Sequence, residues 1–135
     1  MSLTSNLITY ILADTGVTNL IGQNLFDIYV PDDTTYPYCT LVREQMTIED
    51  CLVGKTPLRQ SQYSLAVLSQ TSISGEAVEE AFIALLASLR GMIGTSSVKV
   101  IYYQGSTDSF LPPVDGSEES IHLIELNFEV HWSTA

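Results

Sequence analysis

Positive charge is what this chain has least of. Its five lysine and arginine residues face sixteen aspartate and glutamate residues, which gives a formal net charge of −11. Tight binding to a nucleic-acid backbone requires clustered basic side chains that displace counterions, so the composition argues against a DNA- or RNA-binding protein. The same charge disfavours docking on anionic lipid. The basic residues are Arg43, Lys55, Arg59, Arg90 and Lys99.

Long apolar runs and cysteine motifs are scarce as well. No apolar stretch reaches the roughly 18 residues of a membrane-spanning helix. The N-terminus lacks the basic start and apolar core of a signal peptide, so we expect a protein made in the cytoplasm with no membrane segment. Cys39 and Cys51 have neither CxxC spacing nor nearby histidines, and we interpret them as ordinary thiols. The 135 residues suit one domain, 1–135.

Motifs of catalysis and of cofactor binding are also missing. The sequence holds no phosphate-binding glycine loop, no dinucleotide fingerprint and no nucleophile motif. A metal site could be imagined at His122, Glu125, Glu129 and His131. Strand alternation places His122 on the opposite face, and the other three spread over about 20 Å. We therefore expect no enzyme, no cofactor and no metal.

The most informative pattern that is present is the alternation in residues 121–132. Even positions from 124 onward are apolar, whereas Glu125, Asn127, Glu129 and His131 are polar. Because a strand points successive side chains to opposite faces, one face of this strand is expected to lie on a core. The other face carries two carboxylates. The apolar positions are Ile124, Leu126, Phe128, Val130 and Trp132.

Two segments have the spacing of amphipathic helices. Apolar residues recur at helical intervals in 3–12, with Thr4 or Ser5 as a cap and Gly16 as a stop, and 17–21 can add a turn. A longer stripe predicts a helix over 75–92, with Ser74 as its N-cap. Its apolar positions are Val78, Ala81, Phe82, Leu85, Leu89 and Met92.

Strands are expected around 25–30, 38–46, 59–69 and 98–103, besides the last one. Residues 47–58, with Gly54 and Pro57, suggest a hairpin arm, and the proline- and glycine-containing stretch 104–120 suggests a long loop. This order predicts an α+β fold. We expect a mainly antiparallel sheet of four to five strands, with the N-terminal helix and one long amphipathic helix packed on one face.

The same order of elements resembles the tail-terminator, or tail-completion and tail-to-head joining, proteins of long-tailed phages. The resemblance covers nearly the whole chain but has no sharp motif. It lies in the helix and short second turn of 3–21, in the helix 75–92 that follows a strand at once, and in three sequence stretches. These are Tyr36-Pro37-Tyr38-Cys39-Thr40-Leu41, Gln62-Tyr63-Ser64-Leu65-Ala66-Val67 and Leu126-Asn127-Phe128-Glu129-Val130.

The resemblance implies a structural subunit that forms a ring, typically a homohexamer, at the head-proximal end of the tail tube. Such a ring stops tube polymerisation and joins the tail to the head connector, so the implied partners are further copies of the chain, the tube protein and the connector or neck protein. DNA would pass through the ring without specific binding. The implied location is the virion tail, after synthesis in the host cytoplasm.

Three groups of residues are candidates for contacts in this role, and each has a plainer interpretation. Glu125, Asn127 and Glu129 would face the lumen or a neighbouring subunit, or simply solvent. The apolar residues of the long loop would anchor a partner or fold back onto the core, and the arm would meet an acidic neighbour or remain solvated. The loop candidates are Asp108, Phe110, Leu111 and Val114, and the arm candidates are Leu52, Val53, Lys55 and Arg59.

Two alternatives to the terminator stay open at this point. One is a neighbouring neck or head-completion protein of the same kind of particle. The other is a ligand-binding or regulatory α+β domain unrelated to phages, with the acidic sheet face as its cleft. A concave pocket with converging polar groups would favour the ligand-binding domain. Flat complementary surfaces on opposite edges would favour a ring.

Overall fold

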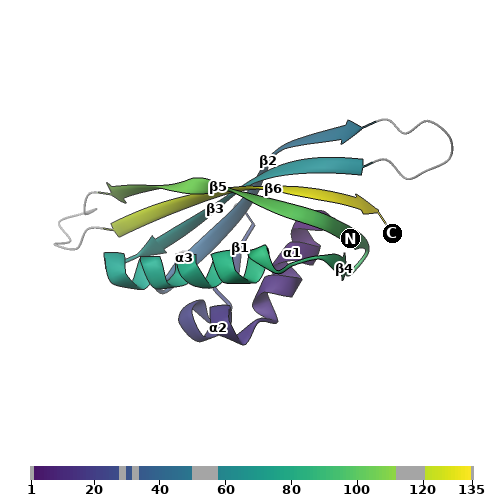
Figure 1. Ribbon diagram of the computed structural model, residues 1–135. Helices are drawn as coiled ribbons and strands as arrows, with labels where there is room; N and C mark the ends of the chain where they lie inside the picture. The colour runs from purple at the N-terminus through teal and green to yellow at the C-terminus, as the bar shows by residue number, and fades with distance from the viewer. Residues whose placement is uncertain (1, 28–29, 32–33, 50–57, 112–120, 135) are drawn as a thin grey trace.

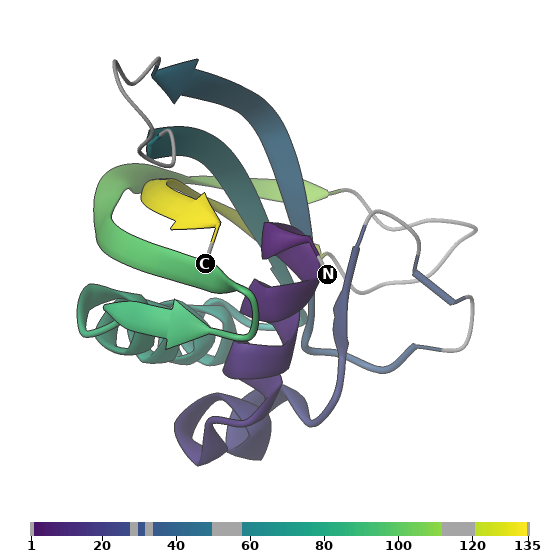
Figure 2. The ribbon, with the colours of Figure 1, turned by 90° about the vertical axis from the view of Figure 1, so that its right-hand side faces the viewer.

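The fold is an α+β arrangement of one curled sheet with helices on one of its sides. In the computed structural model, residues 2–27, 30–31, 34–49, 58–111 and 121–134 are described. Figure 1 shows the helices together below the sheet, and Figure 2 shows how strongly the sheet curls. The expected α+β class and the packing of helices on one face are confirmed.

The helical layer begins with α1 (Leu3–Leu12) and α2 (Thr15–Ile21). The oxygen of Ser2 accepts a hydrogen bond from the Ser5 amide and caps α1, so neither Thr4 nor Ser5 is its N-cap. The helix ends at Ala13 before Gly16 is reached, and Asp14 caps α2 by accepting from the Val17 amide. The expected extra turn at 17–21 is confirmed within α2.

The longest described helix is α3 (Ser72–Ala87), and its bounds differ from the expected 75–92. Its N-cap is Thr71, whose hydroxyl accepts from the Ser74 amide, so the expectation of Ser74 as the cap was wrong. The helix stops at Ser88 because the chain turns into β4 (Gly91–Ile93). Gly91 (φ +97°) begins β4, and that backbone is closed to most L-residues.

Six strands make up the described sheet, in the order β1-β2-β3-β6-β5-β4, one more than the upper expectation. The additional strand is β4 (Gly91–Ile93), which begins where the helix 75–92 was expected to end, and a strand of three residues is too short to show an alternation. The pairs β2–β3, β3–β6, β6–β5 and β5–β4 are antiparallel, and β1–β2 is parallel. The strands are β1 (Leu25–Phe26), β2 (Tyr38–Glu49), β3 (Leu58–Ser69), β5 (Ser96–Leu111) and β6 (Ile121–Thr134), besides β4.

The largest departure from expectation concerns the long loop. Residues 104–111 continue β5, so this half of the expected loop 104–120 is strand, and 112–120 lie outside the described residues. Gly105 was interpreted as a loop signal, yet it sits at a register shift opposite Asn127 with φ +119°. A glycine at such a bulge lets the strand bend and continue instead of ending.

Only the base of the expected hairpin arm 47–58 is described. Residues 47–49 belong to β2 and Leu58 begins β3, while 50–57 lie outside the described residues. At these ends β2 and β3 rise away from the helical layer (Figure 1). Only Leu25 and Phe26 of the expected strand 25–30 pair with the sheet.

One hydrophobic core joins the helical side of the sheet to the helices. The even positions 124–132 of β6 are buried, as the alternation predicts, and so are Leu7 of α1 and Phe82 of α3. Burying such side chains stabilises a fold by about 1.5–3 kcal/mol each. The positions that the core takes from β6 are Ile124, Leu126, Phe128, Val130 and Trp132.

Candidate functional site

The side of the sheet that faces away from the helices is called the outer face here. It presents Glu125, Asn127, Glu129 and His131 of β6, because their even-numbered neighbours point into the core. Glu125 is exposed, and the other three are half-buried. The structure thus brings the candidates Glu125, Asn127 and Glu129 together on one uncovered face, as the alternation predicts.

A chain of polar contacts crosses the outer face from β3 to β5. The amide nitrogen of Gln62 donates to the side-chain oxygen of Gln104. The nitrogen of Gln104 then donates to Glu129 Oε2 at 3.4 Å, and Glu129 Oε1 lies 3.1 Å from His131 Nε2. The ring of Tyr102 meets the His131 ring edge-on, with 5.1 Å between centroids. Three strands therefore hold the Glu129 carboxylate in place.

The charge of this network stays largely negative. Its donors to Glu129 are one neutral amide and one imidazole, and neither lysine nor arginine takes part in it. Within the part of the chain that the structure describes, the His131–Glu129 contact is the one carboxylate–base pair within 4.0 Å. Such a surface attracts cations and repels phosphates, which is the reverse of a nucleic-acid binding site.

A polar hollow of about 220 Å³ lies beside this network. It is shallow and belongs to β2, β3 and β6. Ligand sites are mostly apolar and typically about 300–1,000 Å³, so this hollow is small and too polar for one. Its lining residues are Gln45, Thr47, Gln60, Gln62 and Glu129.

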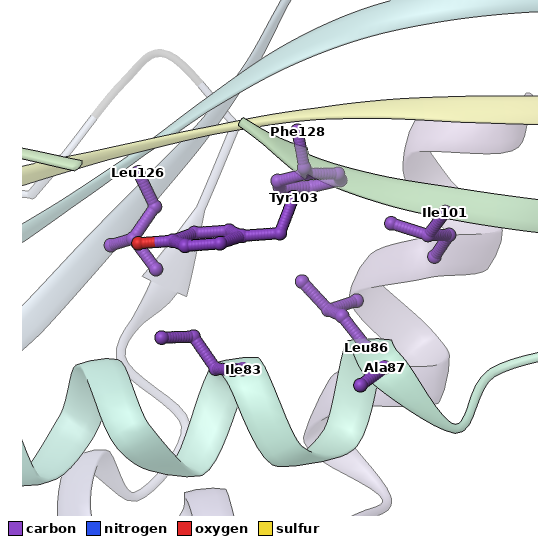
Figure 3. Close-up of a pocket in the computed structure, with 7 residues that line it drawn as sticks. All are labelled: Ile83, Leu86, Ala87, Ile101, Tyr103, Leu126 and Phe128. Carbon is purple, nitrogen blue, oxygen red and sulfur yellow. The ribbon is translucent and has the colours of Figure 1, made fainter. Parts of the chain in front are cut away.

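An apolar recess of about 140 Å³ lies on the helical side, between α3 and the strands β5 and β6. Figure 3 shows Tyr103 reaching across it from β5, with Ile83 and Leu86 of α3 below. Tyr103 is 43 % exposed, so the recess opens toward solvent beside the β5 edge. The recess is about the size of a few methyl groups, which suits an inserted aliphatic side chain better than a cofactor.

The loop candidates separate into described and undescribed residues. Asp108 and Phe110 lie on β5, both exposed, whereas nothing is described of the Leu111 side chain or of Val114. The Phe110 ring is 67 % exposed and stacks on the buried His122 ring, with 4.9 Å between centroids. Phe110 therefore covers a histidine with one side of its ring and presents the other side to solvent.

The arm candidates separate in the same way. Leu52, Val53 and Lys55 lie outside the described residues. The Arg59 guanidinium carbon lies 5.2 Å from the centre of the Trp132 ring, a distance at which a cation–π attraction operates. Trp132 in turn donates from Nε1 to Ser61 Oγ at 2.9 Å. Arg59 thus has a partner within its own chain.

Sequence reasoning missed Gln62, Gln104 and Tyr102. The glutamines at 60 and 62 alternate with core residues of β3, and this weak period-2 signal could have marked them as outer-face residues. Gln104 could not be found in this way, because it sits at the register shift beside Gly105. A bulge interrupts the alternation on which such a prediction depends.

The described residues form neither a metal-binding cluster nor a membrane-spanning helix. Among the described residues, no three histidine, cysteine, aspartate or glutamate side chains are grouped closely enough to hold a metal ion. None of the described helices is both long enough and apolar enough to span a bilayer.

Comparison with known proteins gives a structural likeness without a sequence family. No protein-family model and no curated protein matches the chain. Among solved structures, a chain of the virion of a native gene transfer agent particle superposes with a TM-score of 0.69 at 12% sequence identity. The two chains share a fold. The likeness covers 98% of this chain and 95% of the other, so no large element is missing from either.

Proposed function

We propose that this chain is a structural subunit of a phage-like virion, in which copies form a ring at the head-proximal end of the tail tube. The observation that carries this proposal is the fold shared, over nearly the full length of both chains, with a chain of a gene transfer agent virion. The ring would stop tube polymerisation and join the tail to the head connector. Its partners are other copies of the chain in a homohexameric ring, the tube protein, and the connector or neck protein.

The outer face supports a place along the path of DNA. In a ring, Glu125, Asn127 and Glu129 would line the lumen or meet a neighbouring subunit. A lumen of repeated carboxylates repels phosphate and lets DNA slide without specific binding. The chain's net charge of −11 adds to this repulsion. No catalytic step and no cofactor enters this role.

The contacts with other virion proteins would come from the ends of the strands. Asp108 and Phe110 are exposed on β5, close to the chain segment that contains Val114. A half-exposed aromatic ring is a common anchor at protein interfaces. We assign the loop candidates, including Leu111, to contacts with the connector, the tube or an adjacent subunit, and Leu52, Val53 and Lys55 of the arm to a neighbouring subunit.

Two other functions compete with this one. A neck or head-completion protein fits the same structural likeness, because the matched structure is described only as a particle. A ligand-binding regulatory domain would have to use the polar hollow at Gln62 and Glu129, whose volume of about 220 Å³ is below the usual range.

Removal of the gene from its parent particle tests the proposal. Lysates of the deletion and of a strain complemented with the wild-type gene would be compared by electron microscopy. We expect tails of uncontrolled length that are not attached to filled heads. Normal tails with leaking heads would move the protein to the head neck. Normal particles would remove the virion function altogether and favour the ligand-binding domain.

A further inference from the structure

Both long strands near the margins of the sheet have an edge that the described strands leave largely unpaired. β1 pairs with β2 only at Cys39 and Thr40, and β4 pairs with β5 only at 96–98. Residues 41–49 of β2 and 99–111 of β5 therefore present their outward backbone groups without a described strand partner. We call these stretches the β2 edge and the β5 edge. Such edges bind further strands unless something blocks them.

The directions of the two edges allow one copy of the chain to pair with the next. β2, β3, β6 and β5 alternate in direction, so β2 and β5 run opposite to each other. The β5 edge of one copy beside the β2 edge of another therefore forms an antiparallel pair, the same kind that holds most of this sheet together. Because the two edges differ, the contact is heterologous, and such contacts form a ring when the rotation between successive copies closes.

Several large apolar side chains are exposed on the two edges. Tyr102, Tyr103 and Phe110 on β5 are each more than two fifths exposed, and Ile48 on β2 is 46 % exposed. Tyr103 and Phe110 lie on the helical side of β5, since their register partners are Phe128 and His122. Ile48 lies on the same side of β2, opposite Arg59. Pairing of the edges would cover this apolar surface and extend the recess beside Tyr103 (Figure 3).

The β5 edge and the β2 edge could pair in several registers that keep the helical sides of both copies on the same side of the sheet, and charge favours one of them. Arg43 of β2 and Asp108 of β5 both lie on the helical side, are both exposed, and have no described ion pair within 4.0 Å. Each strand also carries one unpaired residue at a register shift, which is Glu44 in β2 and Gln104 in β5. If these two residues are left out of the count, the register that places Arg43 opposite Asp108 also places Ile48 opposite Tyr103.

We propose that the β5 edge binds the β2 edge of a second copy, with Arg43 paired with Asp108 across the contact. The pairing rests on the proposed ring and specifies how its subunits join. It would make one continuous sheet around the ring, with Glu125 and Glu129 of every copy on the same face. Two like charges at a contact repel, so a charge exchange between the two positions tests the register.

The experiment uses the full chain and measures its oligomeric mass by light scattering and sedimentation over a concentration series. Arg43→Asp and Asp108→Arg should each raise the apparent dissociation constant by roughly tenfold or more, because like charges at an interface repel strongly. The double variant should recover wild-type association. Arg90→Asp and Glu80→Arg are matched controls, since both residues are exposed outside the two edges. Melting temperatures of all variants check that they fold.

Cysteine cross-linking provides a second readout if a charge variant folds poorly. In a Cys51→Ser background, Arg43→Cys with Asp108→Cys should form an intermolecular disulfide ladder on mild oxidation, because opposite residues of paired strands bring their Cβ atoms within about 5.5 Å. Either cysteine alone should not form the ladder. A ladder or a dimer from Arg43→Cys alone would indicate a symmetric contact and overturn the pairing.

The outcomes separate this pairing from the proposed function. A wild-type oligomer that both charge variants leave intact overturns the edge pairing, while the ring itself stands. A wild-type chain that remains monomeric, with no cross-linking of the double cysteine variant, also overturns it. The proposed function fails by a different measurement, namely normal particles after deletion of the gene.

Discussion

The ring of Tyr63 lies on the ring of Phe128 at the centre of the sheet, with 5.5 Å between centroids and 12° between planes. The two residues are register partners on β3 and β6 and are fully buried. The Tyr63 hydroxyl also lies 2.9 Å from Thr4 Oγ1 of α1. This stack therefore connects the first helix to the middle of the sheet.

Tyr63→Phe is expected to lower the free energy of unfolding by about 1 kcal/mol, because it removes only the hydrogen bond to Thr4. Phe128→Ala should lower it by about 3–5 kcal/mol, because it removes the stack and leaves a cavity. Urea denaturation measures both. Tyr103→Phe is the control at an exposed tyrosine and should change little. An equal loss for Tyr63→Phe and Phe128→Ala would contradict the assignment.

Gly94 is expected to be far less replaceable than Gly22, although both have a positive φ, of +59° and +63° respectively. A Cβ at Gly94 would lie 2.4 Å from Asn6 Oδ1, whereas nothing lies within 4 Å of one at Gly22. Asn6 is buried and donates to Ser96 Oγ at 2.9 Å, so displacing it breaks a buried contact.

The Gly22 backbone (φ +63°, ψ −128°) lies in a region that L-residues rarely adopt, so we expect Gly22→Ala to lower the unfolding free energy by about 1–3 kcal/mol through backbone strain alone. Gly94→Ala should lower the unfolding free energy by about 1–3 kcal/mol more than Gly22→Ala does, because this is the usual cost when a buried polar group loses its partner. Chemical denaturation of the two variants gives the comparison. If their losses are equal, the Asn6 side chain moves aside freely.

Arg59 offers a test of whether the arm contact is internal or intersubunit. Arg59→Gln should lower the unfolding free energy by about 0.5–1 kcal/mol, because the attraction to the Trp132 ring is lost. Lys55→Gln serves as the matched variant in the arm and should affect assembly only. Thermal melting and oligomeric mass would be measured for both. Arg59→Gln with normal stability but defective assembly would show that Arg59 serves a neighbouring subunit.

Reversing the charge of the outer face should disturb assembly or DNA passage. Glu125→Lys with Glu129→Lys is expected to lower the yield of infectious or transducing particles by roughly tenfold or more, because phosphate would adhere to a positive lumen. Glutamine at both positions should have a milder effect. The matched control is Glu76→Lys with Glu80→Lys, on the exposed side of α3. An equal loss from the control pair would indicate net charge rather than position.

The Cys39 thiol should not react with thiol reagents in the folded protein. Burial raises the pKa of its thiol far above the ordinary value, so the reactive thiolate is suppressed. In a Cys51→Ser background, a thiol reagent at pH 8 should label Cys39 only after denaturant is added. Fast labelling of the native protein would show that β2 opens locally at this residue.

The same shift sets the direction of a pH effect on stability. A pKa that is higher in the folded chain than in the unfolded chain stabilises the fold at low pH, and this contribution is lost as pH rises past the ordinary thiol range. The unfolding free energy should therefore fall above about pH 8.5, where the unfolded thiol begins to ionise. Burial raises the pKa of Tyr63 as well and adds to the fall at higher pH. Cys39→Ala should show a shallower decline.

Much of the fold could be predicted because its signals are local. The alternation around Phe128 identified the buried and uncovered faces of β6, and the spacing of Val78 and Phe82 identified the core side of α3. The positions of Glu125, Asn127 and Glu129 on one face followed from the same period. Helix and strand ends were less predictable, since Thr71 and Gly105 act through backbone geometry that composition does not reveal.

The amino-acid sequence by itself determined the acidity, the α+β class and the face on which each β6 side chain lies, because these depend on residue type and on a two-residue period. Only the tertiary structure decided that Gln62, Gln104 and Glu129 form one network, because register brings together strands far apart in the chain. It also decided which strands keep free edges. Edge positions follow from the order of all strands in the sheet, which no single segment encodes.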